Sequence, residues 1–310
     1  MVDLATRAAP EAGAASPPDH IADAIRRIGP RFDPAVRSEF IRLYADLLRG
    51  RPQPATRIAR DVAYGPDARH LMDLHVPLHS PAKSLPVLAY FHGDGYVEGH
   101  KNLAGDLIYG CLAEYFVQRG LIVANVTYRL APAAPWPEGA RDVGRAARWL
   151  DDHVAEFGGD PRHVVLMGHS AGGTHVAAYA LHAVLRDGKR PPLAGLVLVS
   201  GTYDVEDAEQ PPNIAAYYGT DRSSYARKST IRNLATGPYP PMLIATAEFD
   251  PQRFRDHADA LARRLTELGA APERLRIPGH NHVSEIYHVG TSDESLGPHV
   301  AAFCKKVAGV

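Results

Sequence analysis

Residues 164–173 read Val-Val-Leu-Met-Gly-His-Ser-Ala-Gly-Gly, an apolar run that leads directly into the pattern Gly-x-Ser-x-Gly. A turn signal, Gly-Gly-Asp-Pro at 158–161, precedes the run, and apolar residues at helical spacing follow it over 176–185. The stretch therefore predicts a buried strand, a sharp turn that exposes Ser170, and a helix that begins beside the serine hydroxyl. The alternative is a loop serine between glycines. The predicted setting suits a nucleophile, because a helix N-terminus favours the negative charge that develops there.

The composition narrows the class of protein. At 310 residues and 45% hydrophobic content, the chain can bury the core of one large α/β domain with a small cap. Its net charge of −1 argues against a nucleic-acid partner or an acidic membrane surface. The two cysteines, Cys111 and Cys304, lie far apart without metal-ligand spacing, and the first twenty residues lack a signal-peptide pattern. We therefore expect a cytoplasmic protein that binds no metal, nucleic acid or membrane.

The order of strand and helix patterns predicts a mostly parallel sheet. Residues 1–18 are predicted to be disordered, 19–55 to form cap helices, and 56–310 to form the main domain. Within that domain, strand patterns alternate with helix patterns after an initial antiparallel pair, which indicates an eight-stranded sheet with helices on both faces. The segment 201–241 is too long for an ordinary connection and is predicted to be an insertion over the serine. The expected strands are 60–64, 70–76, 86–91, 121–128, 163–167, 193–200, 242–247 and 274–277.

A second glycine motif follows the strand expected at 86–91. It reads Tyr-Phe-His-Gly-Asp-Gly-Tyr at 90–96, and its glycines leave backbone N–H groups free to point at one spot. The alternative is an ordinary glycine turn that ends the strand. We expect the N–H groups of Asp94, Gly95 and Ala171 to form an oxyanion hole.

A serine nucleophile needs a base, and the base needs an orienting carboxylate. For this turn type the chain order is Ser, then Asp or Glu, then His, which makes Asp250 the first candidate for the acid. Asp250 precedes a proline at a helix start, so it could instead cap that helix. Glu248 and Asp204 are the second and third choices for the acid.

Two histidines are candidates for the base, because the loop after the last expected strand reads Gly-His-Asn-His at 279–282. We favour His282, and we expect His280 to be a rim or structural residue. A neutral imidazole can accept the serine proton near neutral pH, and an ionised Asp250 would stabilise the imidazolium that forms.

Together these motifs resemble the hormone-sensitive-lipase-like branch of the α/β-hydrolases, which includes many bacterial esterases and kynurenine formamidase-like enzymes. The resemblance covers residue 62 to the C-terminus. It implies Ser170, Asp250 and His282 as nucleophile, acid and base, no cofactor, and a cap built from N-terminal helices and an insertion. The motifs that carry it are His-Gly-Asp-Gly at 92–95, Tyr-Arg-Leu-Ala-Pro at 128–132, Pro-Trp-Pro-Glu at 135–138, Gly-Asp-Pro at 159–161, Gly-His-Ser-Ala-Gly at 168–172, Asp250-Pro251 and His282.

The chain departs from that family at Asp94, where glycine is usual. Aspartate tolerates unusual backbone angles better than most side chains, but its charge would oppose an oxyanion. We therefore expect the Asp94 side chain to turn away from the serine and to form a local hydrogen bond that holds the loop.

The leading hypothesis for function is a serine hydrolase that cleaves small to medium carboxylic esters through an acyl-enzyme. An arylformamidase-like amide hydrolase is the alternative, and a non-catalytic small-molecule receptor is a remote third. A homodimer through the edge strand at 274–277 is a further prediction. The residues expected to line the substrate pocket are Tyr96, His169, Tyr203, Tyr217 and Tyr218.

Overall fold

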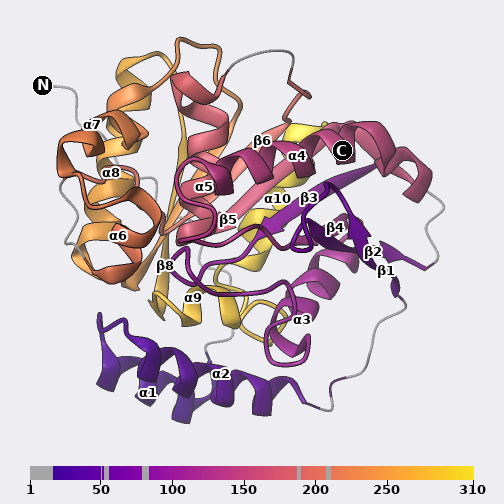
Figure 1. Cartoon of the computed structure of the whole chain (residues 1–310). Coiled ribbons are helices and arrows are strands. Elements are labelled where there is room, and N and C mark those ends of the chain that lie inside the picture. Colours follow the sequence, from indigo (N-terminus) through magenta and orange to yellow (C-terminus); the bar gives the residue numbers. More distant parts are fainter. Residues whose placement is uncertain (1–16, 50, 52–55, 79–83, 187–189, 207–210) are drawn as a thin grey trace, which may run out of the picture.

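Eight strands of the described residues form one sheet in the order β1-β2-β4-β3-β5-β6-β7-β8 (Figure 1). This computed structural model describes residues 17–49, 51, 56–78, 84–186, 190–206 and 211–310. β2 pairs antiparallel with β1 and β4, and the other neighbours are parallel, which confirms the predicted fold class. The strands are β1 (Thr56–Ala63), β2 (Leu71–Pro77), β3 (Leu85–Phe91), β4 (Ile122–Val126), β5 (Gly159–His169), β6 (Gly195–Val199), β7 (Met242–Phe249) and β8 (Glu273–Asn281).

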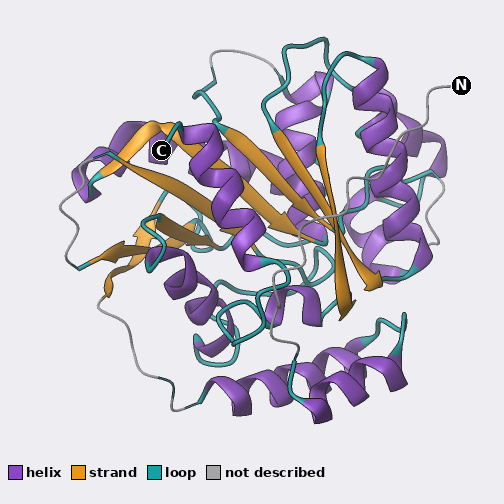
Figure 2. Cartoon of the chain, turned by 180° about the vertical axis from the view of Figure 1, so that it is seen from behind, coloured by secondary structure: helices purple, strands orange, loops and turns teal. Residues whose placement is uncertain are grey.

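Helices cover both faces of the sheet (Figure 2). One face packs against α3 and α10, and the other packs against α4, α5 and α8. No helix of the described part of the chain has the length and hydropathy needed to cross a bilayer. The helices are α1 (Asp19–Ile28), α2 (Pro34–Leu48), α3 (Leu107–Val117), α4 (Glu138–His153), α5 (Ala171–Leu181), α6 (Pro212–Tyr218), α7 (Tyr225–Lys228), α8 (Gln252–Glu267), α9 (Ser284–Tyr287) and α10 (Gly297–Ala308).

The central strands are apolar on both sides because both sides are buried. In β3, Leu88 and Tyr90 belong to the core beneath α3 and α10, whereas Val87, Ala89 and Phe91 belong to the core beneath α4 and α5. This alternation follows the two-residue period of a strand, and it explains why these strands appear in the sequence as continuous apolar runs. β8 pairs only with β7 and is an edge strand, so the dimer through 274–277 stays a prediction.

The N-terminal helices α1 and α2 lie along one edge of the molecule (Figure 1), where α2 packs against α3 and α9, and α1 packs against β8. Ile21, Ile25 and Ile28 form a buried face of α1, and Asp33 caps α2 by accepting a hydrogen bond from the Val36 N–H at 2.9 Å. The division into cap and main domain stays a prediction, and residues 1–16 of the segment predicted to be disordered lie outside the described residues.

The helix that follows Ser170 is shorter than the spacing of the apolar residues over 176–185 predicts. We expected it to extend to Leu185, but α5 ends at Leu181 and the side chain of Val184 is 65% exposed. The reason is a tertiary contact, because His182 adopts an extended backbone and forms a β-bridge with Leu234. That bridge joins the end of α5 to the segment 201–241, which contains α6 and α7, and of which residues 207–210 lie outside the described residues.

A buried carboxylate on α4 anchors the segment that supports the second glycine motif. Asp142 accepts hydrogen bonds from the Arg129 backbone at 3.0 Å and guanidinium at 2.7 Å, and from His70 Nε2 at 2.9 Å. The next residue back, Tyr128, donates its hydroxyl proton toward the carbonyls of His92 and Gly93 at 2.8 and 3.0 Å. Asp142 therefore fixes the chain on which the loop at 92–96 rests.

We predict that Asp142→Asn lowers the free energy of unfolding by about 2 kcal/mol at neutral pH, because the buried amide puts a donor in place of one of the two acceptor oxygens that Arg129 and His70 contact. Burial would raise the pKa of Asp142, but the hydrogen bonds from Arg129 outweigh it and lower the pKa. The charged form therefore stabilises the fold above its unfolded-state pKa, and the difference from wild type shrinks below about pH 4. Urea unfolding at several pH values measures this. The exposed Asp152→Asn on the same helix is the control and should stay within about 0.5 kcal/mol of wild type.

Candidate active site

The turn that carries Ser170 is closed by two glycines at which a side chain has no room. A Cβ on Gly172 would lie 2.1 Å from the carbonyl oxygen of Phe91, and a Cβ on Gly168 would lie 2.3 Å from the carbonyl oxygen of Gly172. Ser170 itself has φ +53°, which is uncommon for a residue with a side chain. The pattern Gly-x-Ser-x-Gly thus lets the end of β5 and the start of α5 pack directly against the end of β3.

Three predicted site residues meet at the carboxyl ends of parallel strands. The Ser170 hydroxyl donates to His282 Nε2 at 2.9 Å, and His282 Nδ1 donates to Asp250 Oδ1 at 2.8 Å. The three residues follow β5, β7 and β8, and each is at least 94% buried. Ser170 and Asp250 are therefore each within direct hydrogen-bond reach of His282.

Asp250 does not cap the helix that it precedes. Its Oδ2 accepts from the Ala247 N–H at 2.8 Å and from the Ser200 hydroxyl at 2.6 Å, and α8 begins without a side-chain cap. The two other acids that we considered are engaged elsewhere, since Glu248 accepts from the Gly279 N–H and Asp204 pairs with Arg232. Asp250 is thus the acid that the structure brings to His282.

The His282 ring lies between two aromatic side chains. Phe254 of α8 stacks on it with ring centroids 4.1 Å apart, and Phe32, just before α2, meets it edge-on at 4.4 Å. His280 lies apart from this arrangement, fully buried, with its Nε2 3.1 Å from Asp293 Oδ2. Of the two roles that we considered for His280, a rim residue or a structural residue, its burial and its contact with Asp293 fit the structural one.

The second glycine motif lies against the serine. A Cβ on Gly93 would lie 3.3 Å from the Cβ of Ser170. Asp94 and Gly95 both have positive φ, of +79° and +62°, and line the same cavity as Ser170 and Ala171. In the described part of the chain, the N–H groups of Asp94, Gly95 and Ala171 donate to no other protein group. They are thus available to a substrate oxygen.

The Asp94 side chain is held by Arg37 of α2 rather than by a local hydrogen bond, which corrects our expectation. Arg37 of α2 meets both carboxylate oxygens, with Nε 2.6 Å from Oδ1 and Nη2 donating to Oδ2 at 2.8 Å. Burial raises the pKa of Asp94, and the charge of Arg37 offsets part of that rise. A planar guanidinium suits this two-point contact, which ties the cap helix to the loop that carries two candidate oxyanion donors.

A cavity of about 550 Å³ opens above Ser170. Of the five residues predicted to line it, only Tyr96 does. Tyr217 stacks behind Tyr96 at 4.6 Å and contacts Tyr218, while Tyr203 lies in the core of the sheet. His169 turns toward the His282 carbonyl, so the other four predictions are corrected. The lining residues are Phe32, Asp33, Pro34, Arg37, Asp94, Gly95, Tyr96, Val97, Glu98, Ser170, Ala171, Thr202, Pro211, Pro212, Asn213, Ile214, Arg253 and Phe254.

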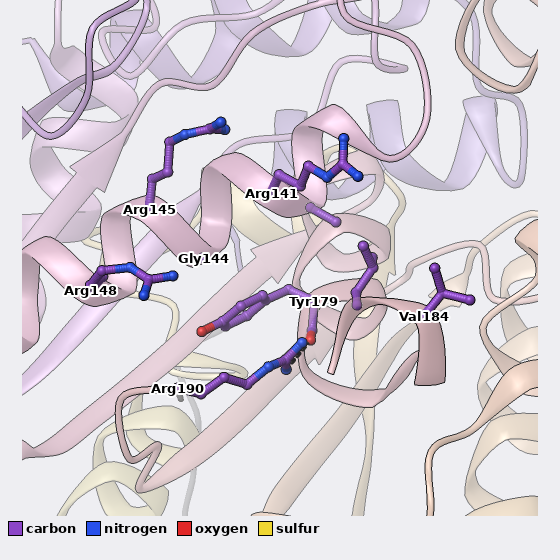
Figure 3. Close-up of a pocket in the computed structure, with 9 residues that line it drawn as sticks. Arg141, Gly144, Arg145, Arg148, Tyr179, Val184 and Arg190 are labelled. Carbon is purple, nitrogen blue, oxygen red and sulfur yellow. Dashed lines mark hydrogen bonds between the residues drawn. The ribbon is translucent and has the colours of Figure 1, made fainter. Parts of the chain in front are cut away.

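A second cavity, of about 210 Å³, lies on the outer side of α4 and α5 and shares no residue with the first (Figure 3). Arginines surround the Tyr179 ring there. Arg141 pairs with Glu138 and Arg145 with Asp142, at 2.5 and 2.7 Å. This cavity has no serine, cysteine or carboxylate in its wall, so it lacks a nucleophile for covalent chemistry on an ester.

Among the residues that the structure describes, two buried groups have the residue types and spacing to hold a metal ion. The first, His169, His282 and Glu285, includes the histidine that contacts Ser170. In the second, His280 Nε2 lies near Asp293, His288 Nδ1 donates to the Ser284 carbonyl, and His288 Nε2 contacts Ser295. Protein groups already partner those ring nitrogens.

Sequence reasoning missed three side chains at the site. Ser200 and Glu285 lie behind Asp250 and His282, and Arg37 holds Asp94. A partial signal existed for the first two, because Ser200 directly follows β6 and Glu285 lies one helical turn beyond His282. No sequence pattern links Arg37 to Asp94, since 57 positions separate them.

The sheet order and the turn at Ser170 define the α/β-hydrolase class. A family model described as alpha/beta hydrolase fold matches residues 88–285, and the chain belongs to that family, in its hormone-sensitive-lipase-like branch. Carboxylesterase NlhH of Mycobacterium tuberculosis is 33% identical over 261 residues, covering 75% of this chain and 78% of NlhH. A bacterial heroin esterase has a TM-score of 0.73 at 23% identity, covering 93% of this chain and 97% of its own. An esterase from Pyrobaculum calidifontis has a TM-score of 0.71 at 23% identity, covering 94% and 99%.

We predict that Arg37→Met and Asp94→Asn each lower kcat/KM by about tenfold, because each one releases the loop that carries the Asp94 and Gly95 N–H groups. The double variant should lose little more than either single variant, with a coupling of about 1–2 kcal/mol between the sites. Glu98→Gln is the matched control, since Glu98 is exposed and 3.6 Å from Arg37, and it should show almost no coupling with Arg37→Met. Additive losses in the Arg37/Asp94 cycle would contradict a role for the pair.

Proposed function

We propose that this protein is a carboxylesterase in which Ser170 is the nucleophile, His282 the general base and Asp250 the orienting carboxylate. The observation that carries the proposal is the continuous hydrogen-bond path from Ser170 through His282 to Asp250, at the floor of the 550 Å³ cavity. Similarity to a mycobacterial carboxylesterase supports the ester as substrate. The amide alternative is not favoured, because the similar proteins are named esterases.

In the first half of the reaction, the Ser170 oxygen attacks the ester carbonyl while its proton passes to His282 Nε2. The carbonyl oxygen becomes an oxyanion, which the N–H groups of Asp94, Gly95 and Ala171 stabilise. When the intermediate collapses, the bond to the alcohol oxygen breaks and His282 returns the proton to that oxygen. The alcohol leaves and the acyl group stays on Ser170.

In the second half, water replaces the alcohol. The water oxygen attacks the acyl carbon while His282 takes a proton from the water. His282 then returns that proton to the Ser170 oxygen as the carboxylic acid departs. Asp250 stays ionised throughout, because three donors from Ala247, Ser200 and His282 surround its carboxylate. Phe32 and Phe254 cover the imidazole faces and limit the access of bulk water to it.

The cavity supports a substrate of modest size. Its walls are mostly apolar, with Phe32, Val97, Ile214 and Phe254 among them, and its volume suits a ligand with a small or medium acyl chain. A non-catalytic receptor would have no need of a serine, a histidine and a carboxylate in hydrogen-bond contact, so the receptor alternative has no observation in its favour.

We predict that Ser170→Ala lowers kcat on nitrophenyl acetate by about ten-thousand-fold, because no nucleophile remains to form the acyl-enzyme. A fluorophosphonate should label wild-type protein at Ser170 and should not label the variant, as mass spectrometry of tryptic peptides would show. Ser223→Ala, in the loop before α7 and outside the cavity, is the control and should keep full activity. Unchanged esterase activity in Ser170→Ala would end the proposal.

We also predict that kcat/KM for nitrophenyl esters peaks at short to medium acyl chains and falls by about a hundredfold for a sixteen-carbon chain, which the cavity cannot enclose. The same assay on an aryl acetate and an N-formyl anilide compares ester with amide. A higher kcat/KM on the anilide would reverse the choice between the two substrates.

A further inference from the structure

Behind His282 lies a second carboxyl group that the proposed mechanism does not use. Glu285, in α9, is completely buried, and its Oε1 lies 3.8 Å from His282 Nδ1. Its Oε1 also lies 3.1 Å from His169 Nε2, and its Oε2 lies 3.0 Å from the Ser200 oxygen. Two buried carboxyl groups, Asp250 and Glu285, therefore flank both the Ser200 hydroxyl and the imidazole.

The position of the Ser200 hydroxyl constrains which of the two carboxyl groups, Asp250 and Glu285, are protonated. It has one proton, yet its oxygen lies 2.6 Å from Asp250 Oδ2 and 3.0 Å from Glu285 Oε2. With both carboxyl groups ionised, one of these oxygen pairs would have no proton between them. With a proton on Glu285, every contact is satisfied, because Glu285 donates to Ser200 and Ser200 donates to Asp250.

The donors and cations around each carboxyl group indicate whether Asp250 or Glu285 holds that proton. Asp250 accepts from three donors, those of Ala247, Ser200 and His282, which stabilise its charge. Glu285 has only shared donors, since His169 Nε2 also donates to the His282 carbonyl at 2.8 Å and the Ala247 N–H, which reaches Glu285, also donates to Asp250 at 2.8 Å. No arginine or lysine among the described residues lies within ion-pair distance of Glu285.

The titratable groups around Glu285 agree with a neutral acid. Burial and the charge of Asp250 raise the pKa of Glu285 well above its usual value. Burial lowers the pKa of His169, so that imidazole is neutral and supplies no compensating charge. The remaining neighbours are His282, and the phenols of Tyr90 and Tyr203, whose pKa values are raised by burial.

We propose that Glu285 is a positioning residue of this site, held as a neutral carboxylic acid that donates to Ser200, which in turn donates to Asp250. The proposal rests on the proposed roles of Ser170, His282 and Asp250. The chain of two hydrogen bonds holds the Asp250 carboxylate so that Oδ1 faces His282. Because Glu285 carries no charge, it does not stabilise the imidazolium further, and His282 remains able to return its proton to the alcohol.

The deciding experiment is the pH dependence of kcat/KM for Glu285→Gln. The amide is neutral, can donate to Ser200 and can accept from His169, so we expect activity within about threefold of wild type. We also expect no shift in the acid limb of the profile. If Glu285 were ionised, its removal would destabilise the imidazolium and move the acid limb to lower pH by about one unit or more. Such a shift, or a Gln variant that fails to fold, would overturn the proposal.

Two further variants test the path through Ser200. Glu285→Leu and Ser200→Ala should each lower kcat by about tenfold or more with little change in KM, because Asp250 loses the support that orients it. The double variant should lose no more than the worse single variant, since both act through one chain of hydrogen bonds. Full kcat in a folded Glu285→Leu variant would show that Glu285 positions nothing.

Labelling separates this proposal from the proposed function. One sample of each variant is treated with the fluorophosphonate, which should label every variant except Ser170→Ala. Untreated samples of all variants, Ser170→Ala included, are assayed for esterase activity. If Ser170→Ala is active, the proposed function fails, whatever the Glu285 variants do. If Ser170→Ala is inactive and Glu285→Gln shifts the acid limb, only the role of Glu285 fails.

Discussion

The site depends on one close contact between backbones, that of Gly172 in the nucleophile turn with Phe91 at the end of β3. There is no space for a Cβ between them, so β5 and β3 bring Ser170 and the loop at 92–96 together at a fixed distance. Both strands are central in the sheet and buried on both faces, which makes them rigid supports. Ser170 and the N–H groups of the loop at 92–96 are therefore positioned by the core of the fold.

The N-terminal segment that contains α2 makes a second set of contacts with the site. Arg37 reaches from α2 to Asp94, and Phe32 from the turn before α2 to the His282 ring, so one N-terminal segment contacts both the oxyanion loop and the proposed base. Where the family usually has glycine, this chain has an aspartate whose charge is neutralised by that segment. The charge of Asp94 is thus compatible with an oxyanion nearby, because Arg37 meets both of its oxygens.

Sequence patterns predicted the features that depend on the order of residues within one segment of the chain. The eight strands, the turn at Ser170 and the positions of Asp250 and His282 after strands all follow from periodicity, turn residues and motif order. The pocket wall could not be predicted in this way, because four of the five residues proposed for it are buried behind or beside the cavity. The early end of α5 was missed for the same reason, since the bridge from His182 to Leu234 joins distant segments.

The polar groups beneath the site show why such contacts matter most for chemistry. Asp250, Ser200 and Glu285 come from three separate segments, and no pattern in the sequence predicts that they contact one another. In the folded protein, the position of the Ser200 hydroxyl constrains the charge of both Asp250 and Glu285. The charge of Glu285 in turn affects the His282 imidazole, because Glu285 Oε1 lies 3.8 Å from His282 Nδ1. A sequence specifies which residue types are present, but their protonation follows from burial and from the count of donors around each oxygen. The acid–base behaviour of His282 is therefore a property of the folded cluster rather than of the histidine alone.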